Sequence, residues 1–455
     1  MQLDLMYSKL VLDVTMRKFL LLFFLSLGIY LMHFWITGQG IYGDGNGYYS
    51  YAHALYFERR LDFTPIYNHL SNFQGRHGTI NRVGWNTEQT VTGLRNNLWT
   101  VGTGLFWIPS LALIHTTSML LGTPISKFSS LYELGPGVTG IILGILGLYF
   151  SEKYLKLFFE KKVSELVIVT LFFTTNFFYY TAFEPALSHQ VAFFLFSLLL
   201  YLSHTVNLSN KLLLIIGIVS GFFIITRLPD TFLLLAPFTI LFMRIKKPIA
   251  ISSMLIIIGG SCVGLLSQLW VQWQLFGSPF VNPYLTGNQG RFTFNLISLT
   301  APLLSVERGL FTWTPVLLLA LYGLWSSRKK KKLKVEAWVG LVTFTLFSLY
   351  IGLWNGGLSA GYGNRLFFST LPFFALGMAW VLKKLSLRSR MALIGMFAMW
   401  NILLLGQFFF DGKRLVLGEG LTLTNFISGQ FTVNAQIIDS FMRHGLRETL
   451  EKATL

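Results

Sequence analysis

Long apolar runs recur along the whole chain, and they limit it to one class of fold. They cover residues 19–36, 98–115, 134–150, 163–183, 189–206, 212–227, 231–243, 249–274, 313–326, 335–354, 366–382 and 391–410. Only 12% of the residues are charged, whereas about 25% is usual in soluble proteins. The runs lack the alternation of barrel strands, so they predict transmembrane α-helices. The expected fold is an all-α polytopic membrane protein.

The formal net charge of +17 would suit a nucleic-acid partner, but the placement of the cations argues for a membrane. Lys and Arg gather in short segments between the apolar runs, as they do in cytoplasmic loops. The clusters are Lys153 with Lys156, Lys161 and Lys162; Lys211; Arg244 with Lys246 and Lys247; Arg328 to Lys332 with Lys334; and Lys383, Lys384, Arg388 and Arg390. We therefore expect membrane lipid, and no nucleic acid, as a partner.

The run 98–115 decides the topology. If it crosses the membrane, every basic cluster after residue 150 falls outside; if it does not cross, they all fall in the cytoplasm. Its Gly102, Gly104, Pro109 and His115 suit a re-entrant or interfacial helix. The prediction is about eleven spans in an inner or plasma membrane, with a cytoplasmic N-terminus and an outer C-terminus. Residues 19–36 are expected to be a retained anchor, because no cleavage pattern follows them.

This topology divides the chain into a transmembrane domain over 1–410 and a short outer tail over 411–455. Residues 38–133 become a long first outer loop with juxtamembrane helices, 275–312 a second outer loop and 355–365 a third. The runs 212–227 and 231–243 are short and are flanked or interrupted by Pro229 and Pro237. Short helices of this kind are tolerated where they line a cavity inside the protein.

Asp44 follows the first apolar run directly, between Gly43 and Gly45. A carboxylate at the outer membrane boundary, held on permissive backbone, suits a general base acting on a hydroxyl. Asp is also a favoured helix N-cap, and a helix is expected from about Tyr48 to Arg60. Both interpretations are open on sequence alone.

Four arginines lie at or beyond the outer ends of predicted spans. They are Arg227, Arg291, Arg308 and Arg365. Guanidinium groups bind phosphate oxygens through paired hydrogen bonds, so converging arginines would form a phosphate site. The alternative for each is a side chain that extends along the helix to the membrane interface.

Further candidates are accessory. Glu88 lies in the first loop, Glu184 and His189 form a polar insertion at an outer span end, and Tyr49 is one of several aromatic residues at a predicted interface. Glu184 with His189 could bind a metal or a phosphate, but a lone histidine is more often structural. The chain has no metalloprotease helix motif, no phosphate-binding loop and only one cysteine, Cys262. No motif therefore supports a tightly held metal, a bound nucleotide or a disulfide framework.

Four stretches resemble the GT-C superfamily of membrane glycosyltransferases, which use polyprenyl-phosphate sugars. They are Gly43-Asp44-Gly45 with Tyr48 and Tyr49, the segment Gly102 to Pro109, the segment Glu307 to Pro315, and the segment Trp354 to Arg365 with Leu371 and Pro372. Their order and spacing are most similar to bacterial relatives of protein O-mannosyltransferases and of the aminoarabinose-to-lipid-A transferase. Each stretch is short, and together they span most of the chain.

The resemblance implies an inverting transfer of a sugar from a polyprenyl phosphate to an envelope acceptor on the outer face. Asp44 would be the base, and Arg365, with Arg308 or Arg227, would hold the donor phosphate. Residues 61–97 would cover the acceptor. The family's acidic motif often has two adjacent acids, whereas Gly45 follows Asp44 here, so a bound divalent cation stays an open alternative.

Other classes compete with this hypothesis. Short, proline-interrupted spans also suit a translocator of lipid-linked sugars or a small-solute transporter, although we find no internal repeat. A scaffold of envelope assembly would tolerate loss of Asp44. An O-antigen polymerase or ligase typically has its large outer loop late in the chain, and here the large loop comes first. The sugar, the prenyl length and the acceptor, whether lipid, glycan or protein, are not specified by the sequence.

Overall fold

The computed structural model describes most of the chain. The described residues are 2–75, 78–84, 88–205, 209–244, 251–281, 283, 292–354, 357–358, 360–418 and 420–451. Lys246, Lys247 and the candidate cation Arg291 lie outside them.

The fold is all-α, with eighteen α-helices in the described residues. Six of these helical segments are long and apolar enough to cross a membrane. They lie at Met16–Thr37 in α1 (Gln2–Thr37), Leu131–Leu155 (α5), Ile251–Phe276 (α11), Lys334–Leu353 (α16), Arg365–Lys384 (the 3₁₀ turn η4, Arg365–Thr370, and α17, Leu371–Lys384) and Leu387–Gly412 in α18 (Leu387–Leu417). This composition indicates a multi-pass membrane protein. Helix α4, Gly102–Leu120, which occupies the ambiguous run, is not among the six.

Four shorter apolar helices add to these candidates. They are α8 (Ser188–Leu202), α9 (Asn210–Thr226), the segment Leu228–Met243, which contains η2 (Leu228–Leu234) and most of α10 (Leu235–Arg244), and α15 (Val316–Ser327). The run 163–183, expected as one span, is broken into α6 (Lys161–Thr174) and α7 (Phe177–Ala182). The break follows from Thr175, whose backbone is extended and whose hydroxyl donates to the Leu171 carbonyl and accepts from the Phe177 N–H.

The chain forms two compact units, each built from separated segments. Unit 1 comprises Met1–Phe150, Tyr180–Leu234 and Leu241–Pro283; unit 2 comprises Ser151–Tyr179, Leu235–Ile240 and Tyr284–Leu455. The sequence predicted a single transmembrane domain over 1–410, so this subdivision was not anticipated.

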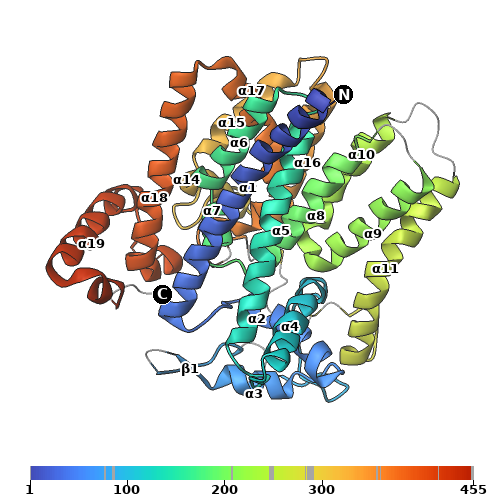
Figure 1. The fold of residues 1–455 in the computed structure, drawn as a ribbon, viewed down its shortest axis with the longest axis vertical. Coiled ribbons are helices and arrows are strands. Elements are labelled where there is room, and N and C mark those ends of the chain that lie inside the picture. Colours follow the sequence, from blue (N-terminus) through green and yellow to red (C-terminus); the bar gives the residue numbers. More distant parts are fainter. Residues whose placement is uncertain are drawn as a thin grey trace. The chain divides into compact units, whose positions relative to one another are not determined.

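In unit 1, close helix packing depends on glycines. Helices α9 and α11 lie side by side (Figure 1), and a Cβ at Gly221 would collide with the Ser261 carbonyl. Helix α2 (Gly45–His53), which continues into the π-helix η1 (Ala54–Glu58), packs against α4 in the same way, because Gly104 lies against the backbone of Tyr48. Small residues let membrane helices approach closely enough to gain dispersion contacts.

Between η1 and α4, the first loop contains a short helix and a β-hairpin. Helix α3 (Thr64–Ser71) leads into a hairpin in which β1 (Phe73–Gly75) pairs antiparallel with β2 (Gly78–Ile80), Phe73 opposite Ile80. The backbone then turns back, and the Arg82 N–H donates to the Leu70 carbonyl at 3.0 Å. The hairpin therefore places Arg82 beneath α3, inside the unit.

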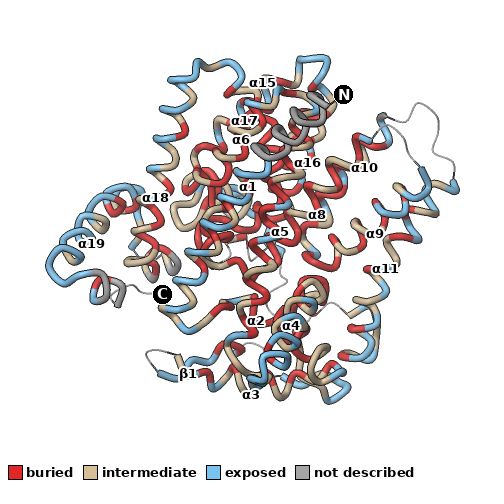
Figure 2. Tube along the Cα trace, viewed as in Figure 1, coloured by how far each residue is buried: buried red, intermediate tan, exposed pale blue. Residues whose placement is uncertain are grey.

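In unit 2, α17 is the central helix and is buried along nearly its whole length (Figure 2). It packs against α6, α15 and α16. Gly377 permits the tightest approach, since a Cβ there would collide with the Ala320 carbonyl of α15. Two short helices, α13 (Leu296–Leu304) and α14 (Leu310–Trp313), precede α15 and carry the loop that contains Arg308.

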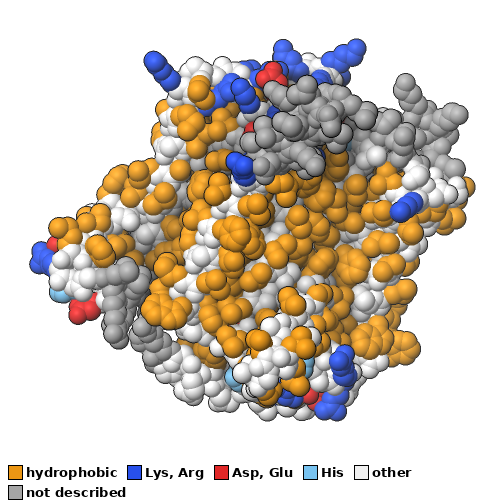
Figure 3. Space-filling model, viewed as in Figure 1, with side chains coloured by type: hydrophobic (Ala, Val, Ile, Leu, Met, Phe, Trp, Pro, Cys, Tyr) orange, Lys and Arg blue, Asp and Glu red, His pale blue; other side chains and the backbone are white. Residues whose placement is uncertain are grey.

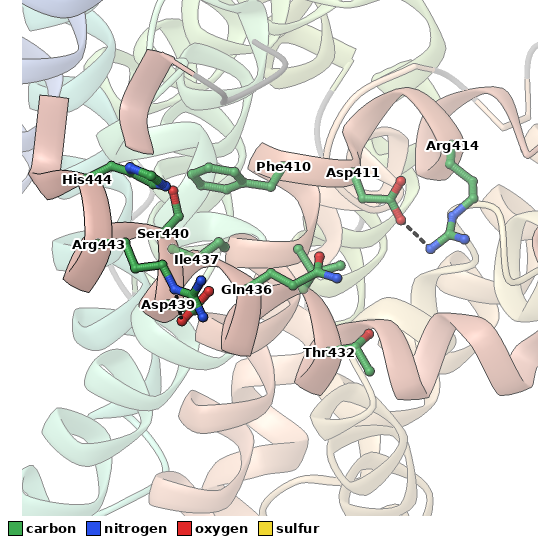
Figure 4. Close-up of a pocket in the computed structure, with 11 residues that line it drawn as sticks. Phe410, Asp411, Arg414, Thr432, Gln436, Ile437, Asp439, Ser440, Arg443 and His444 are labelled. Atoms are coloured by element: carbon green, nitrogen blue, oxygen red, sulfur yellow. Dashed lines mark hydrogen bonds and ion pairs between the residues drawn. The ribbon is translucent and has the colours of Figure 1, made fainter. Parts of the chain in front are cut away.

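The segment 411–455, expected as a short tail, is largely helical. Helix α18 extends to Leu417, and α19 (Leu423–Glu451) packs back against it. A cavity of about 710 Å³ lies between the two helices. Figure 4 shows its polar lining, in which Asp411 pairs with Arg414, and Asp439 pairs with Arg443 at 2.8 Å.

Candidate functional site

Asp44 stands at the first turn of α2, immediately after the loop that leaves α1. Its backbone is already helical (φ −58°, ψ −25°), and its side chain makes no capping hydrogen bond to the helix. Asp44 therefore occupies the N-cap position, as one of the two interpretations expected, but its half-buried carboxylate makes no capping hydrogen bond. Gly43 precedes it with φ +47°, a conformation that disfavours any residue with a Cβ. The loop thus orients Asp44 without using its carboxylate as a cap.

A buried ion pair holds the backbone just before Asp44. Glu133, at the start of α5, accepts from the N–H groups of Gly40 and Ile41 at 2.8 and 3.2 Å. Arg82 donates to the other Glu133 oxygen at 2.7 Å and to the Ile41 carbonyl at 2.7 Å. The two charged residues are 4% and 2% exposed. Removing either partner of a pair this deeply buried costs about 3–5 kcal/mol.

We call Arg82 and Glu133, together with the backbone of residues 40–41, the clamp. Two aromatic side chains pack on it. The Tyr30 hydroxyl of α1 lies 3.2 Å from the Gly40 carbonyl and 3.1 Å from the Glu133 carbonyl. The guanidinium of Arg82 lies 4.5 Å from the centre of the Phe73 ring. The clamp thereby ties α1, α5 and the hairpin to the loop that carries Asp44.

Sequence reasoning missed this clamp. Arg82 and Glu133 are separated by 51 residues, and neither belongs to a motif. The one hint in the sequence is Glu133, an acid directly before the apolar run 134–150. From the sequence alone, an acid in this position is interpreted as an ordinary charge at the membrane interface. Its carboxylate faces inward because two backbone donors and a cation converge on it.

The segment 183–189 packs against the other side of the Asp44 loop. His33 of α1 makes a hydrogen bond of 3.1 Å with the Phe183 carbonyl and stacks on Tyr42, with ring centres 5.4 Å apart. A Cβ at Gly45 would collide with the carbonyl of Ala186. A larger side chain than glycine therefore has no room at position 45, directly after Asp44.

The tyrosines near Asp44 stay protonated. Burial raises the pKa of Tyr42, and the Glu184 carboxylate adds to this rise, while a hydrogen bond to Thr37 at 2.7 Å opposes it. Burial also raises the pKa of Tyr49 well above its ordinary value, with Glu133 as the next contribution. Neither phenol is therefore a base at neutral pH. Glu184, half-buried, is close enough to influence Tyr42 electrostatically.

Arg227 lies at the C-terminal end of α9 in the same unit. Its Nε is 3.1 Å from the Asp230 carboxylate, and its Nη1 donates to the Ser188 hydroxyl at 3.5 Å. Arg227 is nearly buried and Asp230 is fully buried, so their ion pair holds the Arg227 side chain inside the unit. Ser188 lies two residues after Ala186, so Asp44 and Arg227 flank the same short segment.

The other two candidates of unit 1 differ in burial. His189 is buried at the start of α8, with its ring 5.5 Å from that of Tyr180. Glu88 has an exposed side chain, and its carbonyl accepts from the Asn96 N–H at 2.9 Å. His189 therefore belongs to the interior next to Ser188, whereas Glu88 belongs to the loop surface.

Arg308 and Arg365 lie on adjacent loops of unit 2. Arg308 has φ +146°, a strained conformation for a residue with a side chain, and is half-buried. Such strain costs about 1–3 kcal/mol and is concentrated at functional sites. Arg365 begins η4 and is only 9% exposed.

Asn364 joins the Arg365 loop to α13, the helix that precedes the Arg308 loop. Its side-chain oxygen caps η4 by accepting from the Leu366 N–H at 3.2 Å, and its amide nitrogen donates to the carbonyls of Pro302 and Gly357, both at 3.0 Å. The Trp313 indole donates to the Val306 carbonyl at 2.9 Å. Residues on both sides of each arginine are thus fixed by hydrogen bonds.

The candidate site residues fall into two groups. Asp44, Tyr49, Glu88, Glu184, His189 and Arg227 belong to unit 1, and Arg308 and Arg365 belong to unit 2. The structure brings Asp44 and Arg227 to one segment, and Arg308 and Arg365 to neighbouring loops. A role for Asp44 and Arg365 in one reaction stays a prediction.

Within the described residues, no three His, Cys, Asp or Glu side chains are grouped as a metal site would require. Glu133 is engaged with Arg82 and backbone N–H groups, and His33 and His189 lie against aromatic rings. A divalent cation at Asp44 stays an untested alternative.

Comparison of the sequence with models of known protein families finds no match. Comparison with curated proteins also finds none.

Proposed function

We propose that this protein is a membrane glycosyltransferase that moves a sugar from a polyprenyl-phosphate donor to a hydroxyl group of a cell-envelope acceptor. The observation that carries the proposal is the clamped loop: a buried ion pair fixes the backbone at 40–41, directly before the half-buried carboxylate of Asp44. A buried charge pair is a costly way to hold a loop, and such pre-organisation is typical of catalytic groups.

The proposed topology has about eleven spans, with the N-terminus in the cytoplasm and Asp44 at the outer face. It combines the six long apolar segments with the four shorter ones and α6. Under this proposal α4 lies along the outer interface of the membrane. The basic loops 328–334 and 383–390 then lie in the cytoplasm, as short Lys- and Arg-rich loops do.

The proposed chemistry is a single displacement with inversion. Asp44 accepts the proton of the acceptor hydroxyl as its oxygen forms a bond to the anomeric carbon. The bond from that carbon to the phosphate oxygen breaks, and the leaving polyprenyl phosphate keeps the electron pair. The leaving group is a stable anion, so cations that stabilise it are needed more than an acid.

Arg365 and Arg308 are the proposed phosphate ligands. Asn364 ties the Arg365 loop to α13, which directly precedes the Arg308 loop, and the strained backbone of Arg308 is consistent with a functional constraint. Arg227 is a weaker candidate, because Asp230 already neutralises part of its charge. The prenyl chain would stay among the spans, so that the donor need not leave the bilayer.

The test is transfer by purified protein in lipid nanodiscs, supplied with polyprenyl-phosphate sugars and envelope acceptors (lipid A, O-antigen, wall polymer or a protein) and scored by product mass. Asp44→Asn should lose at least about 10²-fold in turnover, the usual contribution of a general base. The matched control is Asp62→Asn, an acid of the same loop that pairs with Arg60 at 3.0 Å; it should keep its turnover. Arg365→Gln should raise the KM for the donor.

Retained turnover in Asp44→Asn would remove this residue from its role. If Asp44→Asn and Asp62→Asn lose activity equally while both stay folded, the loop is needed only for its charge and the base assignment fails.

The alternative is a translocator of lipid-linked sugars, favoured by the short α9 and by the break at η2 just after Arg227. A translocator would move a labelled lipid-linked sugar between leaflets without forming a new glycosidic bond. Proteoliposomes that redistribute the lipid while no product appears, with Asp44→Asn unaffected, would favour this second function.

A further inference from the structure

A groove runs along the surface of unit 2 between α15 and α16. Its volume is about 630 Å³, within the range of ligand sites. The main lining side chains are Leu318, Tyr322, Trp325, Trp338, Val342 and Leu346, which are 43–63% exposed. From Leu318 to Trp325 the groove follows about 10 Å of helix, most of the ~15 Å depth of one membrane leaflet.

One end of the groove is strongly cationic. The guanidinium of Arg328 lies 3.4 Å from the centre of the Trp325 ring and 5.9 Å from that of Trp338. The segment from Arg328 to Lys334 contains six cations. Lys and Arg side chains gather near the ends of α15 and α18 in Figure 3. An apolar groove that ends in positive charge has the polarity of an anionic lipid.

A buried hydrogen-bond donor lies at the same end. Lys330 and Lys384 lie over the ring of Trp380, at 5.9 and 4.6 Å from its centre. The indole N–H of Trp380 is buried and has no hydrogen-bond partner among the described residues. An oxyanion there would accept from this N–H and would be stabilised by both ammonium groups.

We propose that this groove binds a phospholipid with an anionic headgroup. One acyl chain lies between α15 and α16 against Tyr322 and Val342, and the headgroup phosphate accepts from Arg328. Each basic side chain near an anionic lipid contributes roughly fivefold in affinity. A second copy of this chain is disfavoured as the occupant, because facing grooves would bring two sets of six cations together.

The site does not depend on the proposed transferase activity. It is built from α15, α16 and α17, and neither Asp44 nor either proposed phosphate ligand, Arg308 or Arg365, lines it. A lipid bound there would brace the α15–α16 pair in the membrane.

The test is native mass spectrometry of the purified full-length protein, titrated with phosphatidylglycerol and, separately, with phosphatidylcholine of the same acyl chains. The expected result is one phosphatidylglycerol bound at least tenfold more tightly than phosphatidylcholine. The double variant Arg328→Gln with Lys330→Gln should lower the affinity for phosphatidylglycerol more than tenfold. The matched control is Arg388→Gln with Arg390→Gln, which removes the same charge from the start of α18. It should lower the affinity for phosphatidylglycerol less than threefold.

A second pair of variants tests the groove itself. Val342→Trp fills the groove from an exposed position and should abolish the preference for phosphatidylglycerol over phosphatidylcholine. Leu349→Trp, which is exposed on the same helix but outside the groove, should keep that preference. Equal affinity for both lipids, equal losses in the two charge variants, or a dimer that hides the groove would each overturn the proposal.

Discussion

The buried ion pair between Arg82 and Glu133 allows a quantitative prediction. Glu133→Gln keeps the size of the side chain and removes its charge, which leaves Arg82 buried without a counter-ion. Breaking such a pair costs about 3–5 kcal/mol. At roughly 2–4 °C per kcal/mol for a fold of the size of unit 1, the melting temperature of that unit should fall by about 6–20 °C.

The double variant Arg82→Met with Glu133→Leu removes both charges of the pair together with their hydrogen bonds. It buries no charge, so it avoids the cost of an unpaired cation. It also leaves the N–H groups of Gly40 and Ile41 without their acceptor, which costs about 1–3 kcal/mol for each group. The two penalties together are about 2–6 kcal/mol, similar to the loss in Glu133→Gln, so we expect both variants to melt well below the wild type.

The assay is thermal unfolding in detergent, followed by tryptophan fluorescence. Arg60→Gln is the control, since it breaks an ion pair of 3.0 Å in the same loop, but with an arginine that is 70% exposed. An exposed pair contributes about 0–1 kcal/mol. A Glu133→Gln variant that melts within 2 °C of Arg60→Gln would refute the role given to the clamp.

Three further predictions follow from the packing and the titration of unit 1. Gly45→Ala should destabilise the unit by about 1–3 kcal/mol, because its Cβ meets the Ala186 carbonyl, and a normal melting temperature would contradict this contact. Gly221→Leu should force α9 from α11 and lower the yield of folded protein, whereas Gly259→Leu, on α11 with open space around its Cβ, should not; equal yields would count against glycine-dependent packing. Burial lowers the pKa of His53 to about 4, so the free energy of unfolding should be highest above pH ~6.5 and about 2 kcal/mol lower at pH 5. The melting temperatures at pH 7.5 and pH 5 should therefore differ less in His53→Phe than in the wild type. An equal difference in the two proteins would exclude His53 as the cause.

The helical membrane character was predictable because apolar run length is a local property of the sequence. The helix within 98–115 was anticipated for the same reason, and α4 is absent from the long apolar candidates because its glycines, proline and histidine lower its hydropathy. Whether α4 crosses the membrane stays a prediction.

Contacts between distant residues were not predictable. The clamp joins Arg82 to Glu133, and Gly45 packs on Ala186, which no spacing rule connects. The break at Thr175 was missed because β-branched polar residues are common inside membrane helices, and the side-chain hydrogen bonds that end α6 appear only in three dimensions. Loop cations such as Arg227 were recognised as candidates, but their partner Asp230 was not.

The position of α6 in unit 2 has a consequence for biosynthesis. Helix α6 packs on α17 and α18, which the ribosome makes roughly 200 residues later. At about 5–20 residues per second, α6 waits ~10–40 s for its neighbours. During that interval the carbonyls of Phe173 and Thr175 lack the Asn401 amide that serves them in the finished fold, at 2.9 and 3.1 Å. A nascent chain halted before Asn401 should therefore be recognised by membrane quality control as unfinished, however well its first unit has assembled.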